Sequence, residues 1–184
     1  MTVGPGGRDL FRCFVLPTNL TEDRIVTSIE VRPSNPRVVH HTLNFIDRNG
    51  RGRELEKKEK ERPKTGNEQD FGPGYSRSMG VGFQPQGGLS GWAPGQRARH
   101  LPEGTGYFLP KGSDVVVQVH YHRTGRVEKD NTKIGLYFAK KPTQKQFQGM
   151  VIPGRFLFIP KDNQRYKVEG AIEVLQDCVL HSVK

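Results

Sequence analysis

Apolar and polar residues alternate along much of the chain, which is the pattern of β-strands that bury one face. In the segment 25–31, Ile25, Ile29 and Val31 fall on one face of an extended strand, whereas Ser28 and Glu30 fall on the other. The same reasoning predicts strands at residues 25–31, 38–47, 107–109, 115–122, 134–139, 148–152, 156–159 and 166–175.

Glycine and proline interrupt these strands, with 22 Gly and 13 Pro in 184 residues. Short strands with such punctuation predict an all-β fold, an antiparallel jelly-roll-like β-sandwich with long Gly/Pro-rich loops. The longest connection runs from residue 48 to about residue 106. Because a structureless loop of that length is unusual in a compact domain, we expect this connection to contain short strands or a loop with a functional role. The mixed-charge run 54–61 predicts a solvated loop or a short exposed helix.

A polar segment at residues 141–146 predicts a boundary between two parts of the chain. The first part, residues 1–141, is long enough for a β-sandwich, whereas 142–184 is too short for an independent core. The chain ends inside an apolar, strand-like run. We therefore expect 142–184 to be a linker followed by the truncated start of a second domain.

The net charge of +10 is typical of nucleic-acid-binding proteins, but the distribution of the charges argues against that function. Basic and acidic residues are mixed between positions 48 and 64, and no helix-turn-helix, RNA-recognition or zinc-finger pattern occurs. No run approaches the roughly 18 apolar residues of a membrane span, and residues 1–9 contain no apolar signal region. We expect neither a nucleic-acid partner nor a membrane span.

Six histidines occur in the sequence, and four of them cluster in two predicted strands. On a regular strand His120 and His122 share one face with Gln118, about 7 Å apart. His40 and His41 are adjacent and point to opposite faces, so both can reach one metal only at a bulge, a twist or a strand end. An all-histidine site suits copper or a catalytic zinc ion, although single strand histidines are also common as surface or partly buried residues.

Five sequence elements occur in a specific order: DLFRCFVLP at 9–17, VVHHTL at 38–43, GWAPG at 91–95, LPEGTG at 101–106 and VQVHY at 117–121. Together they resemble the N-terminal catalytic domain of the copper type II, ascorbate-dependent monooxygenases. This is the family of peptidylglycine α-hydroxylating and dopamine β-monooxygenase, which has many bacterial relatives. The resemblance covers most of residues 9–140, and it implies the copper-binding, electron-transfer half of an oxidoreductase. The whole enzyme would hydroxylate a C–H bond of a small or peptide substrate with O2, and ascorbate would be the external reductant.

The resemblance also implies roles for individual residues. His40, His41 and His120 match the ligands of the electron-transfer copper, and no catalytic residue is assigned. Gln118 matches a polar residue beside that site, and Tyr121 and His122 are further auxiliary residues. His122 departs from the animal enzymes; it could be a fourth copper ligand, a proton donor or a solvent-facing residue, and we favour the last two.

In the resembled family a second copper, held by a His-x-His pair and a methionine, activates oxygen in the C-terminal domain. That pair is expected just beyond Lys184, and Met79 and Met150 do not match the methionine, so we expect this chain to be inactive alone. Cys13 matches a family cysteine that is usually disulfide-bonded, but the matching partner region near Asn131 has no cysteine.

Two further expectations concern location and function. The resemblance implies an extracytoplasmic protein whose export signal would lie upstream of this sequence. The main alternative to the monooxygenase is a non-catalytic β-sandwich that binds copper or another ligand, such as a carbohydrate or a protein.

The two cysteines, Cys13 and Cys178, form no metal or redox motif and could either pair or both be buried thiols.

Overall fold

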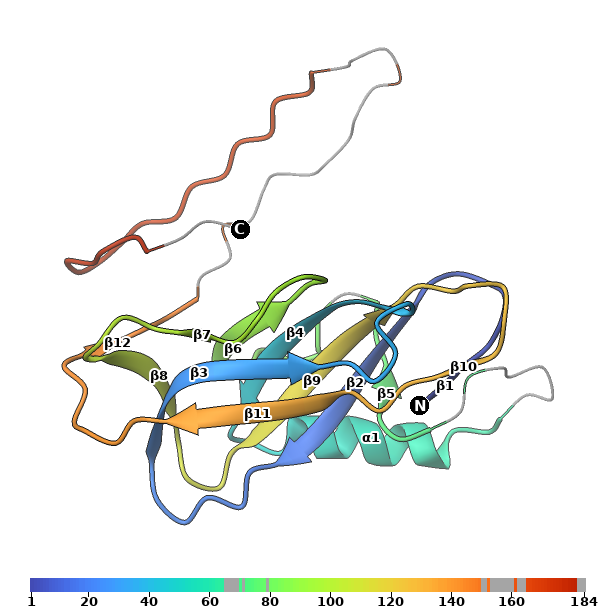
Figure 1. Ribbon diagram of the computed structural model, residues 1–184, viewed down its shortest axis with the longest axis horizontal. Coiled ribbons are helices and arrows are strands. Elements are labelled where there is room, and N and C mark those ends of the chain that lie inside the picture. The colour runs from blue at the N-terminus through green and yellow to red at the C-terminus, as the bar shows by residue number, and fades with distance from the viewer. Residues whose placement is uncertain are drawn as a thin grey trace. The chain divides into compact units, whose positions relative to one another are not determined.

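The strands are arranged as an all-β sandwich, which confirms the predicted fold class (Figure 1). The computed structural model describes residues 1–64, 70, 72–78, 80–149, 152, 161 and 165–181. The chain divides into two units, Met1–Gly149 and Met150–Lys184. All strands of the described residues lie in the first unit, together with one short helix.

Two five-stranded sheets form the sandwich. The first, here the histidine sheet, has the order β5-β2-β9-β4-β6. Its strands are β2 (Leu10–Pro17), β4 (Val39–Asp47), β5 (Tyr75–Ser76), β6 (Gly87–Trp92) and β9 (Asp114–Tyr121). The second has the order β11-β3-β8-β12, with β7 also paired to β3. Its strands are β3 (Arg24–Arg32), β7 (Arg99–His100), β8 (Thr105–Leu109), β11 (Lys133–Phe138) and β12 (Lys145–Gln146).

The remaining pairings complete the first unit. Strands β1 (Thr2–Val3) and β10 (Glu128–Lys129) form a small antiparallel ribbon. The sheets are antiparallel as predicted, except that β12 pairs with β8 in parallel. The first unit extends to Gly149, past the predicted boundary at residue 141. Two contacts join this extension to β8: the β12–β8 pair, and the rings of Phe147 and Tyr107, whose centroids are 5.2 Å apart.

The central strand β9 is buried on both faces of the histidine sheet. Val115, Val117, Val119 and Tyr121 belong to the main hydrophobic core, which also includes residues of the second sheet. Val116 belongs instead to a smaller cluster with Cys13, Tyr75 and Val81. Because neighbouring side chains on a strand point to opposite faces, His120 lies on the same side of the sheet as Val116, away from the main core.

A helix, α1 (Arg51–Glu61), covers part of that outer face, so the mixed-charge run forms a short helix. Gly52 allows the close approach, because a Cβ atom there would lie only 2.9 Å from a methyl group of Val116. An ion pair of 2.9 Å between Arg12 and Glu59 fixes the far end of the helix to β2. The helix is therefore docked against the histidine sheet despite its high charge.

Five predicted strands correspond to β3, β4, β8, β9 and β11, with ends that differ by at most two residues. The prediction for 156–159 lies outside the described residues, as does part of 148–152, whose described residues are not in a strand. The prediction for 166–175 is wrong: these residues form no strand and are exposed. They have no paired strand among the described residues, and a lone strand leaves its backbone groups unpaired.

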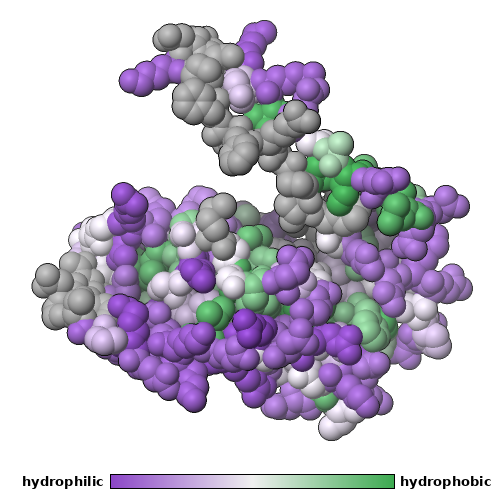
Figure 2. Space-filling view, turned by 180° about the vertical axis from the view of Figure 1, so that it is seen from behind, coloured by the Kyte–Doolittle hydropathy of each residue, from purple (hydrophilic) through white to green (hydrophobic). Residues whose placement is uncertain are grey.

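The surface of the first unit is mainly hydrophilic on the face that Figure 2 shows, with hydrophobic patches scattered between the polar residues. Elsewhere on this unit, α1 carries exposed ion pairs between Arg51 and Glu54 and between Lys57 and Glu61. No helix among the described residues is long and apolar enough to cross a membrane.

Both cysteines are free thiols, so they do not pair, and only Cys13 is buried while Cys178 is exposed. Burial raises the pKa of Cys13 to about 11. At pH 8 roughly one Cys13 thiol in a thousand is then ionised, and the thiolate is the reactive form. We expect a thiol reagent such as Ellman's to modify one cysteine, Cys178, in the folded protein and both after unfolding. Mass spectrometry locates the label, and rapid modification of Cys13 at pH 8 would contradict this expectation.

Candidate metal centre

Three histidines from neighbouring strands converge on the outer face of the histidine sheet. His40 and His41 lie on β4, and His120 lies near the end of β9. In the antiparallel β4–β9 pair, Val39 is opposite Tyr121 and His41 is opposite His120. The register therefore shifts by one residue, and His40 is the extra residue of a β-bulge. The bulge confirms the predicted condition under which both adjacent histidines can reach one site.

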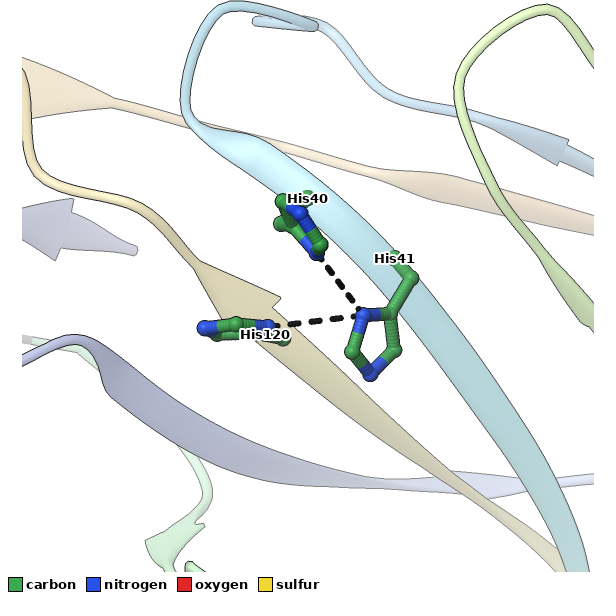
Figure 3. A group of neighbouring side chains, drawn as sticks. All are labelled: His40, His41 and His120. Atoms are coloured by element: carbon green, nitrogen blue, oxygen red, sulfur yellow. Dashed lines mark hydrogen bonds between the residues drawn. The ribbon is translucent and has the colours of Figure 1, made fainter. Parts of the chain in front are cut away.

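The Nδ1 atoms of the three rings face one another (Figure 3). The Nδ1 atoms of His40 and His41 are 3.0 Å apart, and those of His41 and His120 are 3.4 Å apart. One ligand atom from each of the three histidines lies within 4.8 Å of the other two. Imidazole nitrogens bind zinc at about 2.0–2.1 Å, so two of them on one metal lie about 2.9–4.1 Å apart for bond angles of roughly 90–180°. Two of the spacings already suit coordination of a single ion.

The electrostatics of the cluster favour a neutral imidazole at His41. Burial, and then the neighbouring charges of His120 and His40, lower the pKa of His41. A neutral imidazole offers a nitrogen lone pair, which a metal ion requires. Nδ1 of His41 lies within hydrogen-bond distance of Nδ1 of His40 and of His120. A cation that replaced the hydrogen between two such nitrogens would receive a lone pair from each of them. Three nitrogen donors without a thiolate suit copper or zinc rather than magnesium or calcium.

Two residues beside β9 hold the His120 ring in place. Phe11 lies opposite His120 in the β2–β9 pair, and the two rings stack with centroids 4.1 Å apart and an interplanar angle of 10°. At the edge of the His120 ring, Nε2 lies 3.0 Å from Oδ2 of Asp9. Partial burial opposes ionisation of Asp9, but hydrogen bonds from His120 and His122 outweigh it and lower the pKa of Asp9. Asp9 and Phe11 were not among the residues that the sequence pattern singled out as site residues.

The structure places Gln118 and Tyr121 away from the three Nδ1 atoms. The Gln118 amide donates hydrogen bonds to the carbonyl oxygens of Arg77 and Gly80, at 2.9 and 2.6 Å. The Tyr121 ring is buried in the main core, and its hydroxyl donates a 3.0 Å hydrogen bond to Asp130. In the described part of the chain, Gln118 fixes a loop and Tyr121 fixes the core, and neither is hydrogen-bonded to a histidine.

His122 lies outside the cluster of three histidines. Its side chain is 62% exposed, and its Nδ1 atom lies 3.3 Å from Oδ1 of Asp9. Of the positions considered for His122, the structure shows the solvent-facing one, in contact with a residue that also contacts His120.

A hollow of about 290 Å³ that opens to solvent lies beside Asp9 and Phe11, the two residues that contact His120. It is lined by Asp9, Leu10, Phe11, Ser76, Arg77 and Ser78. Since Phe11 stacks on His120, a small molecule in this hollow would be separated from the His120 ring by one aromatic side chain. The hollow thus provides room for a small polar molecule one side chain away from the histidine cluster.

No protein-family model matches the chain, and no curated protein matches it. The function is therefore inferred from the sequence motifs and from the geometry of this site.

Proposed function

We propose that this chain is the copper-binding, electron-transfer half of a copper- and ascorbate-dependent monooxygenase. The observation that carries the proposal is the convergence of three Nδ1 atoms, from His40, His41 and His120, at a β-bulge. The ordered motifs that resemble the copper type II monooxygenases supply the choice of copper over zinc. His40, His41 and His120 would hold the ion, which supplies one-electron transfer between Cu(II) and Cu(I) when bound.

The protein's own residues would keep this electron transfer fast by limiting movement. The ligands come from two hydrogen-bonded strands in the middle of a five-stranded sheet, so the backbone positions are fixed. Stacking on Phe11 restricts the His120 ring. Neutral imidazole nitrogens are ligands for both oxidation states, so neither strand must rearrange when the charge changes.

Ascorbate is the proposed external reductant, and the hollow beside the cluster supports this part of the proposal. Arg77 lines the hollow and offers a positive charge to an anionic reductant, while Ser76 and Ser78 offer hydroxyl groups. The proposed partners of the whole enzyme are O2, a small or peptide substrate and a C-terminal domain that activates oxygen. We also propose an extracytoplasmic location, on the resemblance alone.

A copper titration followed by electron paramagnetic resonance tests this proposal. We expect one Cu(II) ion per chain, with nitrogen hyperfine splitting, and loss of the signal when ascorbate is added without oxygen. With oxygen and candidate C–H substrates we expect copper reoxidation but no hydroxylated product from this chain alone. Copper that binds but is not reduced would favour the non-catalytic copper-binding module. Hydroxylation by the purified chain would contradict its assignment as half of the enzyme, and zinc binding without copper binding would contradict the choice of metal.

A further inference from the structure

Asp9 contacts both His120, a proposed metal ligand, and His122, whose side chain is exposed to solvent. Its Oδ2 atom lies 3.0 Å from Nε2 of His120, and its Oδ1 atom lies 3.3 Å from Nδ1 of His122. Asp9 comes directly before β2, the strand that pairs with β9, so the pairing that aligns Phe11 with His120 also brings this carboxylate to the ring edge. The sheet itself therefore sets the contact between Asp9 and His120.

The backbone that carries Asp9 is also anchored. The Arg123 guanidinium donates hydrogen bonds to the carbonyl oxygens of Arg8 and Gly4, at 2.6 and 2.9 Å. The same guanidinium forms an ion pair with Asp70 at 2.8 Å. Asp9 is thus held on a fixed segment although its own side chain is 36% exposed.

The contact with Asp9 determines which nitrogen of His120 is available to a metal. A carboxylate only accepts hydrogen bonds, so Nε2 of His120 must carry the hydrogen that it donates to Asp9. In the neutral ring the other nitrogen, Nδ1, then bears the lone pair, and Nδ1 is the atom that faces His41. A carboxylate in this position also makes the imidazole a more basic ligand.

We infer that Asp9 is a positioning residue, which fixes His120 as an Nδ1 ligand and stabilises the oxidised ion through its negative charge. This inference rests on the proposed function, since it concerns the same copper ion. Asp9 contacts the ligand and not the metal, so its effect is transmitted through the His120 ring. Phe11 restrains the plane of that ring, and Asp9 restrains its rotation within the plane and its tautomer.

Two substitutions separate the positioning effect from the charge effect. In Asp9→Asn the amide oxygen still accepts a hydrogen bond from Nε2, but the negative charge is lost. In Asp9→Ala both are lost. We expect Asp9→Ala to weaken Cu(II) binding about 10–100-fold and Asp9→Asn to weaken it less. We expect both variants to have a higher reduction potential than the wild type, because the loss of a nearby anion favours Cu(I) over Cu(II).

A measurement without metal tests the positioning effect by itself. Nitrogen-15 NMR at pH 8 distinguishes protonated from unprotonated imidazole nitrogens. We expect His120 to carry its hydrogen on Nε2 in the wild type and in Asp9→Asn, and to become a mixture of tautomers in Asp9→Ala. A purely structural role for Asp9 would change neither the tautomer nor the reduction potential of a folded variant.

Two matched variants control for other effects. Glu22→Gln removes one exposed carboxylate that pairs only with Arg24 among the described residues, so it reports the effect of net charge alone. His122→Gln removes the second partner of Asp9 and leaves the contact with His120. We expect the Glu22 variant to match the wild type in affinity, potential and tautomer, and the His122 variant to keep the wild-type tautomer.

The outcomes separate failure of this inference from failure of the proposed function. Unchanged tautomer, affinity and potential in Asp9→Ala would overturn the role of Asp9 while the copper site stands. If the wild type binds no copper, the proposed function fails, and the tautomer of the metal-free protein still decides whether Asp9 positions His120.

Discussion

Replacement of His120 by alanine is expected to weaken Cu(II) binding by more than about 100-fold. Loss of a residue that only supports a ligand typically costs 10–100-fold in metal affinity, and loss of a ligand should exceed that range. Of the three proposed ligands, β9 supplies His120 and β4 supplies the other two, so removal of His120 leaves His40 and His41 on a single strand. A titration against a competing chelator, followed by electron paramagnetic resonance, measures the effect.

A matched control distinguishes this effect from a general loss of histidine. His100 is exposed on β7 in the second sheet, where its ring contacts Tyr137 at 5.5 Å between centroids. His100→Ala should keep one copper ion per chain with wild-type affinity. Circular dichroism should show the same β-sheet content for both variants, because His120 is only partly buried. Wild-type copper affinity in a folded His120→Ala variant would remove this residue from the site.

The resemblance to the copper monooxygenases implied the set of three histidines, and strand geometry added one condition to it. If both His40 and His41 serve one site, the strand that carries them needs a bulge, a twist or an end at that point. The structure contains that bulge, and it pairs His41 with His120. The sequence did not reveal which nitrogen of each ring faces the site, because ring orientation depends on neighbours from another strand.

Those neighbours were missed because β2 shows no alternation. Leu10 and Phe14 pack on the main core, whereas Cys13 and Val15 pack on the smaller cluster, so both faces of this strand carry apolar residues. A strand buried on both sides has no polar face, and its partners cannot be found from periodicity. The contact of Asp9 with His120 depends on the β2–β9 register, so it could not be predicted from the sequence pattern.

At residues 166–175 the sequence alternates, but the structure contains no strand. Tyr166, Val168, Ile172 and Val174 occupy alternate positions, yet each of them is exposed. Alternation shows only that a segment could bury one face against a partner. It does not show that the partner is present, and the described residues provide none here. An alternating pattern and a paired neighbour are separate requirements for a strand. The alternating strand β3 meets both, because it pairs with β11 and β8, whereas 166–175 has no paired strand among the described residues.

Pairing in the first unit depends on a buried carboxylate, Asp130. Its Oδ1 atom accepts hydrogen bonds from the backbone N–H groups of Ser34 and Asn35, both at 3.1 Å. Its Oδ2 atom accepts from the Tyr121 hydroxyl at 3.0 Å and from the Thr132 hydroxyl at 2.7 Å. Asp130 thereby joins the turn before β4, the end of β9 and the start of β11.

We expect Asp130→Ala to lower the free energy of unfolding by about 3–5 kcal/mol. Each buried donor left without an acceptor costs about 1–3 kcal/mol, and water entering the site would recover part of the total. Urea denaturation followed by circular dichroism gives the difference. The variant should also bind copper more weakly, because Asn35 accepts hydrogen bonds from Val38 and Val39 just before His40.

Asp23→Ala is the matched control for this effect, since it removes the same side chain from an exposed position. Within the described part of the chain its Oδ1 atom accepts one hydrogen bond, from the N–H group of Lys111 at 2.8 Å, and we expect a loss of about 1 kcal/mol or less. An equal loss in the two variants would show that Asp130 contributes no more than a surface carboxylate. A large loss of stability with unchanged copper affinity would show instead that the bulge at His40 forms independently of the Asp130 network.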